Sequence, residues 1–218
     1  MTKLMMSLLI LSNAVVAEEA LQWRSELLSG YRSLNYSAGG TELEGDVFSA
    51  GAGLTAIHGR FYSTLSAERD IYAHSKTPNI DKFNRSDAAL SVGYGIGDNI
   101  SLFIGYKQGL TKLNTTELQA KGLFIGAGAG LPTRYGVFSF SAAFANLSAD
   151  YRDAKFHAYS GNARGTSLNA AWHGKLSESL TYGLSLVRHE YYYQHFSTLL
   201  FNVNENILSL YASLQYQF

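Results

Sequence analysis

The chain has 218 residues, of which 46% are hydrophobic, and its 17 basic side chains balance 17 acidic ones. This length fits one domain with a continuous apolar surface. Because phosphate binding relies on a clear basic excess, the balanced charge gives no reason to expect nucleic acid as a partner. Cysteine is absent, which excludes disulfides and thiolate metal sites. Abundant Gly, Tyr and Phe favour strands and tight turns over helices.

The N-terminus has the three parts of a secretory signal peptide. Lys3 supplies a positive charge, Leu4 to Leu11 form a short apolar run, and Val15 to Ala17 offer small residues for cleavage. About a dozen apolar residues are too few for a helix that spans a bilayer, which needs about 20. We therefore predict a signal peptide over residues 1–17 and a mature domain over residues 18–218.

Short segments of the mature part alternate between apolar and polar residues. Successive side chains of a strand point to opposite faces, so each segment has one apolar face and one polar face. The clearest case is the last, where every second residue from Leu208 to Phe218 is apolar. In chain order the predicted strands are Trp23–Tyr36, Phe48–Ala56, Phe61–Ala67, Ala88–Ile96, Ile100–Lys107, Leu123–Leu131, Phe138–Phe144, Leu168–Trp172, Leu180–Leu186 and Leu208–Phe218.

The connections between these strands alternate in length. The short turns are His58-Gly59, Gly97–Asn99, Pro132–Gly136 and Lys175–Ser179, and the long polar loops are Ser37–Asp46, Ala73–Arg85, Gly109–Ala120, Asp150–Ala163 and Tyr193–Asn204. Transmembrane barrels have short periplasmic turns, longer extracellular loops and even strand numbers. The pattern predicts an all-β, antiparallel up-and-down transmembrane barrel of ten strands, or of eight if Trp23–Ala56 is not two strands.

Three features indicate that the apolar face points outward to lipid. Ten strands would place about 40 to 50 apolar side chains inside, whereas barrels of about eight strands are just filled by their interior side chains. The other face is rich in Gly, Ser, Ala and Asn, while a water-exposed surface carries more charge. Aromatic residues of the apolar register gather near the short turns and predict one membrane girdle. These residues are Phe61, Tyr94, Phe138, Trp172, Tyr182, Tyr216 and Phe218.

The last nine residues, Leu210 to Phe218, resemble the C-terminal signature of Gram-negative outer-membrane proteins. That signature is an alternating strand with a terminal Phe, and the barrel-assembly machinery reads it. The resemblance implies an outer-membrane location, the assembly machinery and outer-membrane lipid as partners, and Tyr216 and Phe218 as the assembly signal.

The predicted register also selects the residues that point into the lumen. The proposed pore-lining set is Ser91, Gly93, Lys107, Gly126, Gly128, Asn169, His173 and His189. Missing side chains at the glycines would widen a water-filled path. Alternatively, the glycines ease strand curvature or accommodate Phe103 and Phe124, and the charged lumen residues pair across the barrel and plug it.

Two families of enzymes have barrels of this kind, and residues near the predicted rim resemble their catalytic residues in part. Omptin-type proteases use Asp and His at the rim, where this chain has Asp150, Asp153, His157, His189, Glu190 and His195 without a distinguishing spacing. The run from His157 to Ala163 resembles the His-x-Ser-Asn run of lipid A deacylases. Here His157 and Ser160 are three apart, so on a strand they would face opposite ways.

We therefore expect a non-enzymatic outer-membrane protein without cofactor or metal. The leading expectation is a narrow, porin-like passive channel for small solutes. The alternative is a closed barrel that acts through its surface loops in adhesion or envelope integrity. A hydrolase at the rim, of omptin or lipid A deacylase type, is the remote alternative.

Overall fold

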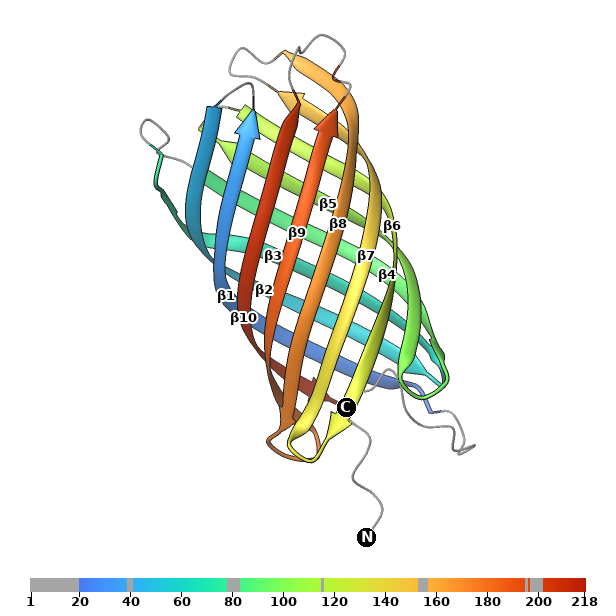
Figure 1. Ribbon diagram of the computed structural model, residues 1–218. Helices are drawn as coiled ribbons and strands as arrows, with labels where there is room; N and C mark the ends of the chain where they lie inside the picture. Colours follow the sequence, from blue (N-terminus) through green and yellow to red (C-terminus); the bar gives the residue numbers. More distant parts are fainter. Residues whose placement is uncertain are drawn as a thin grey trace.

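The computed structural model describes residues 20–38, 41–77, 83–114, 116–152, 157–194, 196 and 202–218. They form one closed antiparallel sheet in which each strand pairs with its sequence neighbours and the last with the first (Figure 1). The ten strands are β1 (Gln22–Ala38), β2 (Thr41–His58), β3 (Phe61–Ser75), β4 (Phe83–Ile96), β5 (Ile100–Leu113), β6 (Thr116–Thr133), β7 (Gly136–Arg152), β8 (Ala158–Lys175), β9 (Leu180–Gln194) and β10 (Val203–Gln217). The ten-stranded prediction is confirmed. The predicted signal peptide lies outside the described residues.

The pairing of β1 with β10 closes the sheet. Its register runs from Arg24 opposite Gln217 to Ala38 opposite Val203. At the end of this seam the backbone amide of Phe218 donates to the carbonyl oxygen of Trp23 over 3.0 Å, and the reverse bond is 3.2 Å long. Closure gives each of the ten described strands a neighbour on both sides, so the sheet has no edge strand. Among the described residues, no helix is long and apolar enough to cross a membrane.

A belt of exposed apolar side chains surrounds the outside of the barrel. Leu27 and Leu123 have 64% and 60% of their surface exposed, although leucine is mostly buried in water-soluble proteins. On β10 the belt extends from Phe218 to Leu208. That stretch spans about 33 Å along the strand and, at a tilt of about 40°, about 25 Å along the barrel axis, the height of a transmembrane apolar band. The apolar face points outward, as the alternation predicted.

Aromatic rings border the belt at the end of the barrel that carries the short turns, here called the turn end. All seven predicted girdle residues lie on the outward-facing side of their strands. Ring centroids of Phe61 and Tyr94 are 4.8 Å apart, and those of Trp172 and Tyr182 are 5.2 Å apart. The rings therefore form contacts along the outer wall, as the predicted girdle requires.

The alternation reverses toward the opposite end, here called the loop end. On β10 Leu208 points outward, whereas its neighbour Ile207 points inward and is buried. On β2 the same reversal separates the outward Phe48 from the buried, inward Val47. A strand that leaves hydrocarbon meets water outside, so its apolar side chains are stabilised only inside the barrel. We call this part of the barrel the collar. Its outward-facing residues include Asn35, Ser37, Glu42, Glu44, Asn146, Arg164, Glu190, Tyr192, Asn204 and Asn206.

The predicted long loops are shorter in the structure, because the strands continue into the collar. The prediction of a loop at Ser37–Asp46 is wrong, because β1 continues to Ala38 and β2 begins at Thr41. The other four predicted loops also contain strand residues: Ala73–Arg85, Gly109–Ala120, Asp150–Ala163 and Tyr193–Asn204. Polar residues indicated loops in the sequence, but here they form the water-facing side of strands.

Inward-facing glycines receive aromatic rings from neighbouring strands. A Cβ atom added to Gly93 would lie 2.1 Å from the ring of Tyr62, and one added to Gly126 would lie 2.4 Å from the ring of Phe103. A third pair is Gly105 with Phe124. The glycines thus accommodate large neighbours, which confirms the alternative explanation of their clustering at these positions.

This packing can be tested at Gly93, where the nearest obstacle is only the side chain of Tyr62. We expect Gly93→Ala to lower the free energy of unfolding by about 1–3 kcal/mol, since it overpacks the interior. When combined with Tyr62→Ala, the loss should fall short of the sum of the two single losses by about 0.5–3 kcal/mol. Urea unfolding of the vesicle-inserted barrel measures both quantities, and strictly additive losses would contradict the contact.

Candidate functional site

Arg32 is the centre of a charged cluster inside the barrel. The residue has only 2% of its surface exposed. Its Nη1 lies 3.2 Å from Oδ1 of Asp70 and its Nη2 lies 3.2 Å from Oδ2 of Asp87. Nη2 also pairs with Glu68, and Nε donates to the hydroxyl of Tyr211 over 2.9 Å. One guanidinium group from β1 therefore contacts side chains of β3, β4 and β10.

Arg85 extends the cluster to the other strands. Its Nη2 lies 2.8 Å from Oδ1 of Asp87, and its Nη1 lies 2.6 Å from Oε2 of Glu205. Glu205 also accepts hydrogen bonds from the hydroxyls of Thr111, over 2.7 Å, and Tyr193, over 2.8 Å. The carboxylate is thus fully partnered although only 1% of the residue is exposed.

We call this cluster the ion network. Its members are Arg32, Glu68, Asp70, Arg85, Asp87, Thr111, Tyr193, Glu205 and Tyr211. They come from β1, β3, β4, β5, β9 and β10, so the network joins strands across the lumen. A buried charge is tolerated only when opposite charges and hydrogen bonds compensate its lost hydration, and here each arginine meets more than one carboxylate.

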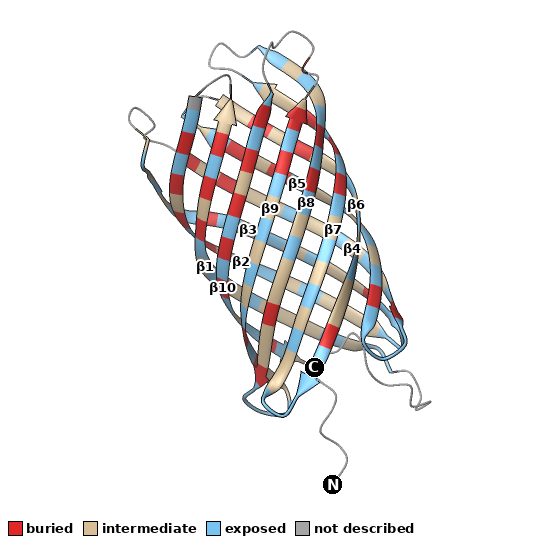
Figure 2. Cartoon of the chain, in the orientation of Figure 1, coloured by how far each residue is buried: buried red, intermediate tan, exposed pale blue. Residues whose placement is uncertain are grey.

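Apolar side chains fill the lumen within the collar. Figure 2 shows most buried residues in the upper half of the barrel, toward the loop end. We call this set the apolar plug. It consists of Leu34, Tyr36, Leu43, Val47, Phe83, Leu118, Ala120, Ala145, Leu147, Ala149, Ala163, Tyr191, Tyr193, Phe196, Val203 and Ile207. None of them has more than 7% of its surface exposed. Side chains with so little exposure do not border a water-filled path.

The lumen toward the turn end has a different character. Inward-facing residues such as Ser91, Ser141 and Ser185 are small and polar, and they are half-buried. The ion network and the apolar plug, by contrast, consist of buried side chains. Toward the turn end, small polar residues share the inner face with the rings of Tyr62, Phe103 and Phe124, so the predicted small, polar inner face is found there only in part, and it is wrong for the collar.

All eight predicted pore-lining residues face the lumen. They are Ser91, Gly93, Lys107, Gly126, Gly128, Asn169, His173 and His189. The structure brings Lys107 to Tyr191, whose hydroxyl it contacts and whose ring centroid lies 4.8 Å from its Nζ. Nδ1 of His189 lies 2.6 Å from the hydroxyl oxygen of Ser167. Orientation agrees with the predicted register, whereas a role in conduction stays a prediction.

The sequence analysis missed Arg32, Arg85 and Glu205. The first lies in the least regular predicted strand, and the other two lie at or next to the ends of predicted loops. One signal was available: Arg85 and Asp87 are two residues apart, as are Glu68 and Asp70, and this spacing places both members of each pair on one strand face.

The candidate rim residues do not converge on one point. Asp150 accepts a hydrogen bond from Ser160 on the outer wall, over 2.7 Å, and Glu190 pairs with Arg188, also outside. His189 points into the lumen instead. Two further candidates, Asp153 and His195, lie outside the described residues. In the part of the chain that the structure describes, no group of three or more His, Asp or Glu side chains could hold a metal ion.

Solved structures share this architecture. The outer membrane protease OmpT from Escherichia coli superposes with a TM-score of 0.67 at 8% identity, over 95% of this chain and 100% of that chain. The chain is an outer-membrane-type β-barrel. The barrel also resembles the translocator domain of the autotransporter NalP from Neisseria meningitidis, with a TM-score of 0.46 at 11% identity, over 90% of this chain and 88% of that chain. Neisserial surface protein A gives a TM-score of 0.45 at 9% identity, over 89% of this chain and 97% of that chain.

No protein-family model and no curated protein matches the chain. At such low identities the solved structures support the barrel fold alone. Any function has to be argued from the barrel's own side chains.

The ion network can be tested by removing one charge from it. We expect Arg85→Met to lower the free energy of unfolding by about 3–5 kcal/mol, because it leaves buried carboxylates without compensation. The control is Arg188→Met, which breaks an ion pair whose side chains are 52% and 51% exposed. Arg188→Met should lower the free energy of unfolding by no more than about 1 kcal/mol. Equal losses in urea unfolding would contradict the network.

Proposed function

We propose that this chain is an outer-membrane barrel with a closed lumen that acts through its collar and loop end, in adhesion or in envelope integrity. The burial of the ion network and of the apolar plug is the observation that carries the proposal. A solute entering from the turn end would meet the ion network, in which Arg32, Arg85, Asp70 and Glu205 are at most 3% exposed. It would then meet the apolar plug, whose side chains are at most 7% exposed and mostly carry no group that could replace hydration.

The proposed location is the outer membrane of a Gram-negative bacterium, reached through a signal peptide that is cleaved. The height of the apolar belt, the aromatic rings at its border and the closed sheet support this location. Transmembrane barrels place their short turns in the periplasm. In that orientation the collar and the loop end project from the cell and can meet other molecules.

Conductance tests the closed lumen. We expect the refolded mature protein, residues 18–218, to give no discrete current steps in a planar bilayer. The reason is that no continuous water-filled path crosses the ion network and the apolar plug. Insertion is verified separately by resistance of the strands to protease, and an open porin in the same bilayer serves as positive control.

Reproducible current steps would contradict the proposal and support the narrow passive channel for small solutes. In that case Gly126→Leu and Gly128→Leu, which add bulk on the inner face of β6, should reduce the current.

We also propose that the barrel is not an enzyme and needs no cofactor. The candidate rim residues support this proposal by their placement. Asp150 and Glu190 lie on the outer wall with other partners, and His189 lies inside. These three side chains therefore do not face a common point.

The proposed partners are outer-membrane lipid and, during biogenesis, the barrel-assembly machinery. The last residue, Phe218, supports the second partner: it is 63% exposed, stacks on Tyr216 with ring centroids 6.0 Å apart, and ends the strand that closes the barrel. An exposed ring on the closing strand can be recognised before closure.

We expect Phe218→Ala to lower the amount of folded barrel in the outer membrane of cells several-fold, because assembly and not stability is impaired. The matched control is Phe140→Ala, which removes a belt ring of β7 that is 49% exposed. The measurement is the heat-modifiable band in membrane fractions. Equal amounts for both variants would contradict the assembly signal.

A further inference from the structure

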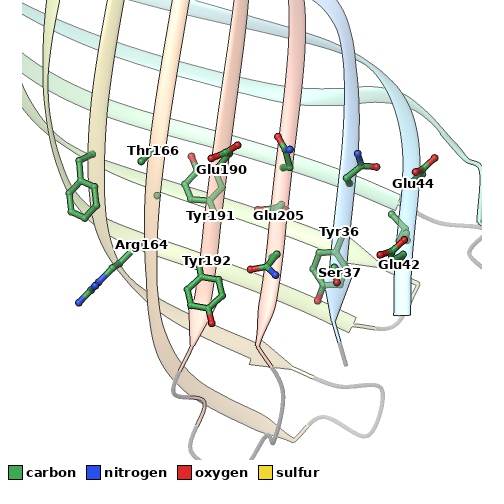
Figure 3. A pocket seen from close by; sticks show the side chains of 16 residues that line it. Tyr36, Ser37, Glu42, Glu44, Arg164, Thr166, Glu190, Tyr191, Tyr192 and Glu205 are labelled. Atoms are coloured by element: carbon green, nitrogen blue, oxygen red, sulfur yellow. The ribbon is translucent and has the colours of Figure 1, made fainter. Parts of the chain in front are cut away.

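A groove crosses the outer wall of the collar. Its volume is about 580 Å³, which lies within the range of about 300–1,000 Å³ for small-ligand sites. In Figure 3, where the loop end is at the bottom, Arg164 and Tyr192 lie on one side of the groove, and Glu42 and Glu44 lie on the other.

The strand register builds the groove as two rows of outward-facing side chains. Directly paired positions from β8 through β9, β10 and β1 to β2 form each row. The first row is Thr166, Glu190, Asn206, Asn35 and Glu44, and the second is Arg164, Tyr192, Asn204, Ser37 and Glu42. The floor lies over the seam between β10 and β1, where the side chains are short amides and a hydroxyl. Longer side chains on the flanking strands form the walls.

The chemistry of the lining suits an uncharged, hydroxyl-rich ligand. Each asparagine side chain both donates and accepts, and the glutamates accept, so the groove can match hydroxyls that also do both. The lining contains four carboxylates, three from the outward-facing rows and that of Glu205 on the inner side, and one guanidinium, from Arg164. This balance disfavours a phosphate or another anion. The ring of Tyr192, whose residue is 41% exposed, offers an apolar face for the C–H side of a sugar ring.

The position of the groove points to the lipid layer as the source of the ligand. Phe144 lines the groove and is itself a belt residue, 48% exposed on the outer wall. In the register Phe144 lies directly opposite Thr166, so the belt and the first row are continuous. Because the side chains of the two rows point away from the barrel axis, the groove opens sideways, over the lipids that surround the belt.

We propose that this groove binds the sugar headgroup of a glycolipid of the outer leaflet, which lies beside the barrel with its acyl chains against the belt. The inference rests on the proposed outer-membrane location and deepens the proposed role by naming the partner. The floor residues Asn35 and Asn206 would hydrogen-bond sugar hydroxyls.

The test uses the whole mature barrel in phosphatidylcholine vesicles that contain digalactosyldiacylglycerol, a glycolipid with an uncharged disaccharide headgroup. Native mass spectrometry of the extracted barrel measures retained lipid. We expect the wild-type barrel to retain digalactosyldiacylglycerol but not the anionic phosphatidylglycerol supplied at the same mole fraction. Asn35→Leu combined with Asn206→Leu removes two hydrogen-bonding groups, and the apparent affinity should fall about tenfold. The control, Gln108→Leu, changes an exposed, outward side chain of β5 and should retain the lipid as the wild type does.

Equal retention by the double variant and the wild type would overturn the proposal. If the double variant does not insert, Asn204→Leu tests the second row in the same way. Equal binding of the soluble oligosaccharide, released from the same lipid, would also overturn it, because the ligand would then be a free glycan. These outcomes are independent of conductance: a silent barrel that binds no glycolipid overturns only this inference, and a conducting barrel that binds it overturns only the closed lumen.

Discussion

Peptide groups in hydrocarbon have to be hydrogen-bonded within the protein, because each unpaired one costs several kcal/mol. The pairing of β1 with β10 satisfies this requirement by closing the sheet. Closure then determines what the rest of the chain can do. The outer wall must be apolar where lipid surrounds it, and every other side chain has to be placed in the interior, in the collar or at the two ends.

A ten-stranded barrel has a wider interior than the eight-stranded barrels that side chains just fill. This chain fills the additional space with large side chains: arginines and tyrosines in the ion network, and rings that pack over glycines such as Gly93. Within the collar the apolar residues turn inward, and the barrel there resembles a water-soluble domain with a core. The same reversal that buries the apolar plug also gives the outer wall its polar groove, next to the apolar belt.

The sequence was sufficient to predict the strand order, the outward face and the aromatic rings at the turn end, because the period of two persists from Ala88 to Tyr106 and from Leu208 to Phe218. It failed at the collar, because polar residues on the water-facing side of a strand resemble the composition of a loop. Two adjacent apolar residues, as at Val47-Phe48 and Ile207-Leu208, mark the reversal of the pattern and could have revealed it. The contact of Arg32 with Asp87 was beyond prediction, since the alternation does not state which strands face one another across a lumen. The groove could not be predicted from the sequence for the same reason, because it depends on the register of five strands.

Accessibility of single cysteines tests the closed lumen most directly, because the natural chain contains none. Ser141 and Ala145 both point inward from β7, but the first is half-buried toward the turn end and the second is 3% exposed within the apolar plug. The measurement is the rate at which a charged, water-soluble thiol reagent labels Ser141→Cys and Ala145→Cys in the inserted barrel. A closed lumen predicts labelling of the first and protection of the second until the barrel is unfolded. Rapid labelling of both cysteine variants in the folded barrel would show a continuous water-filled path and contradict the closed lumen.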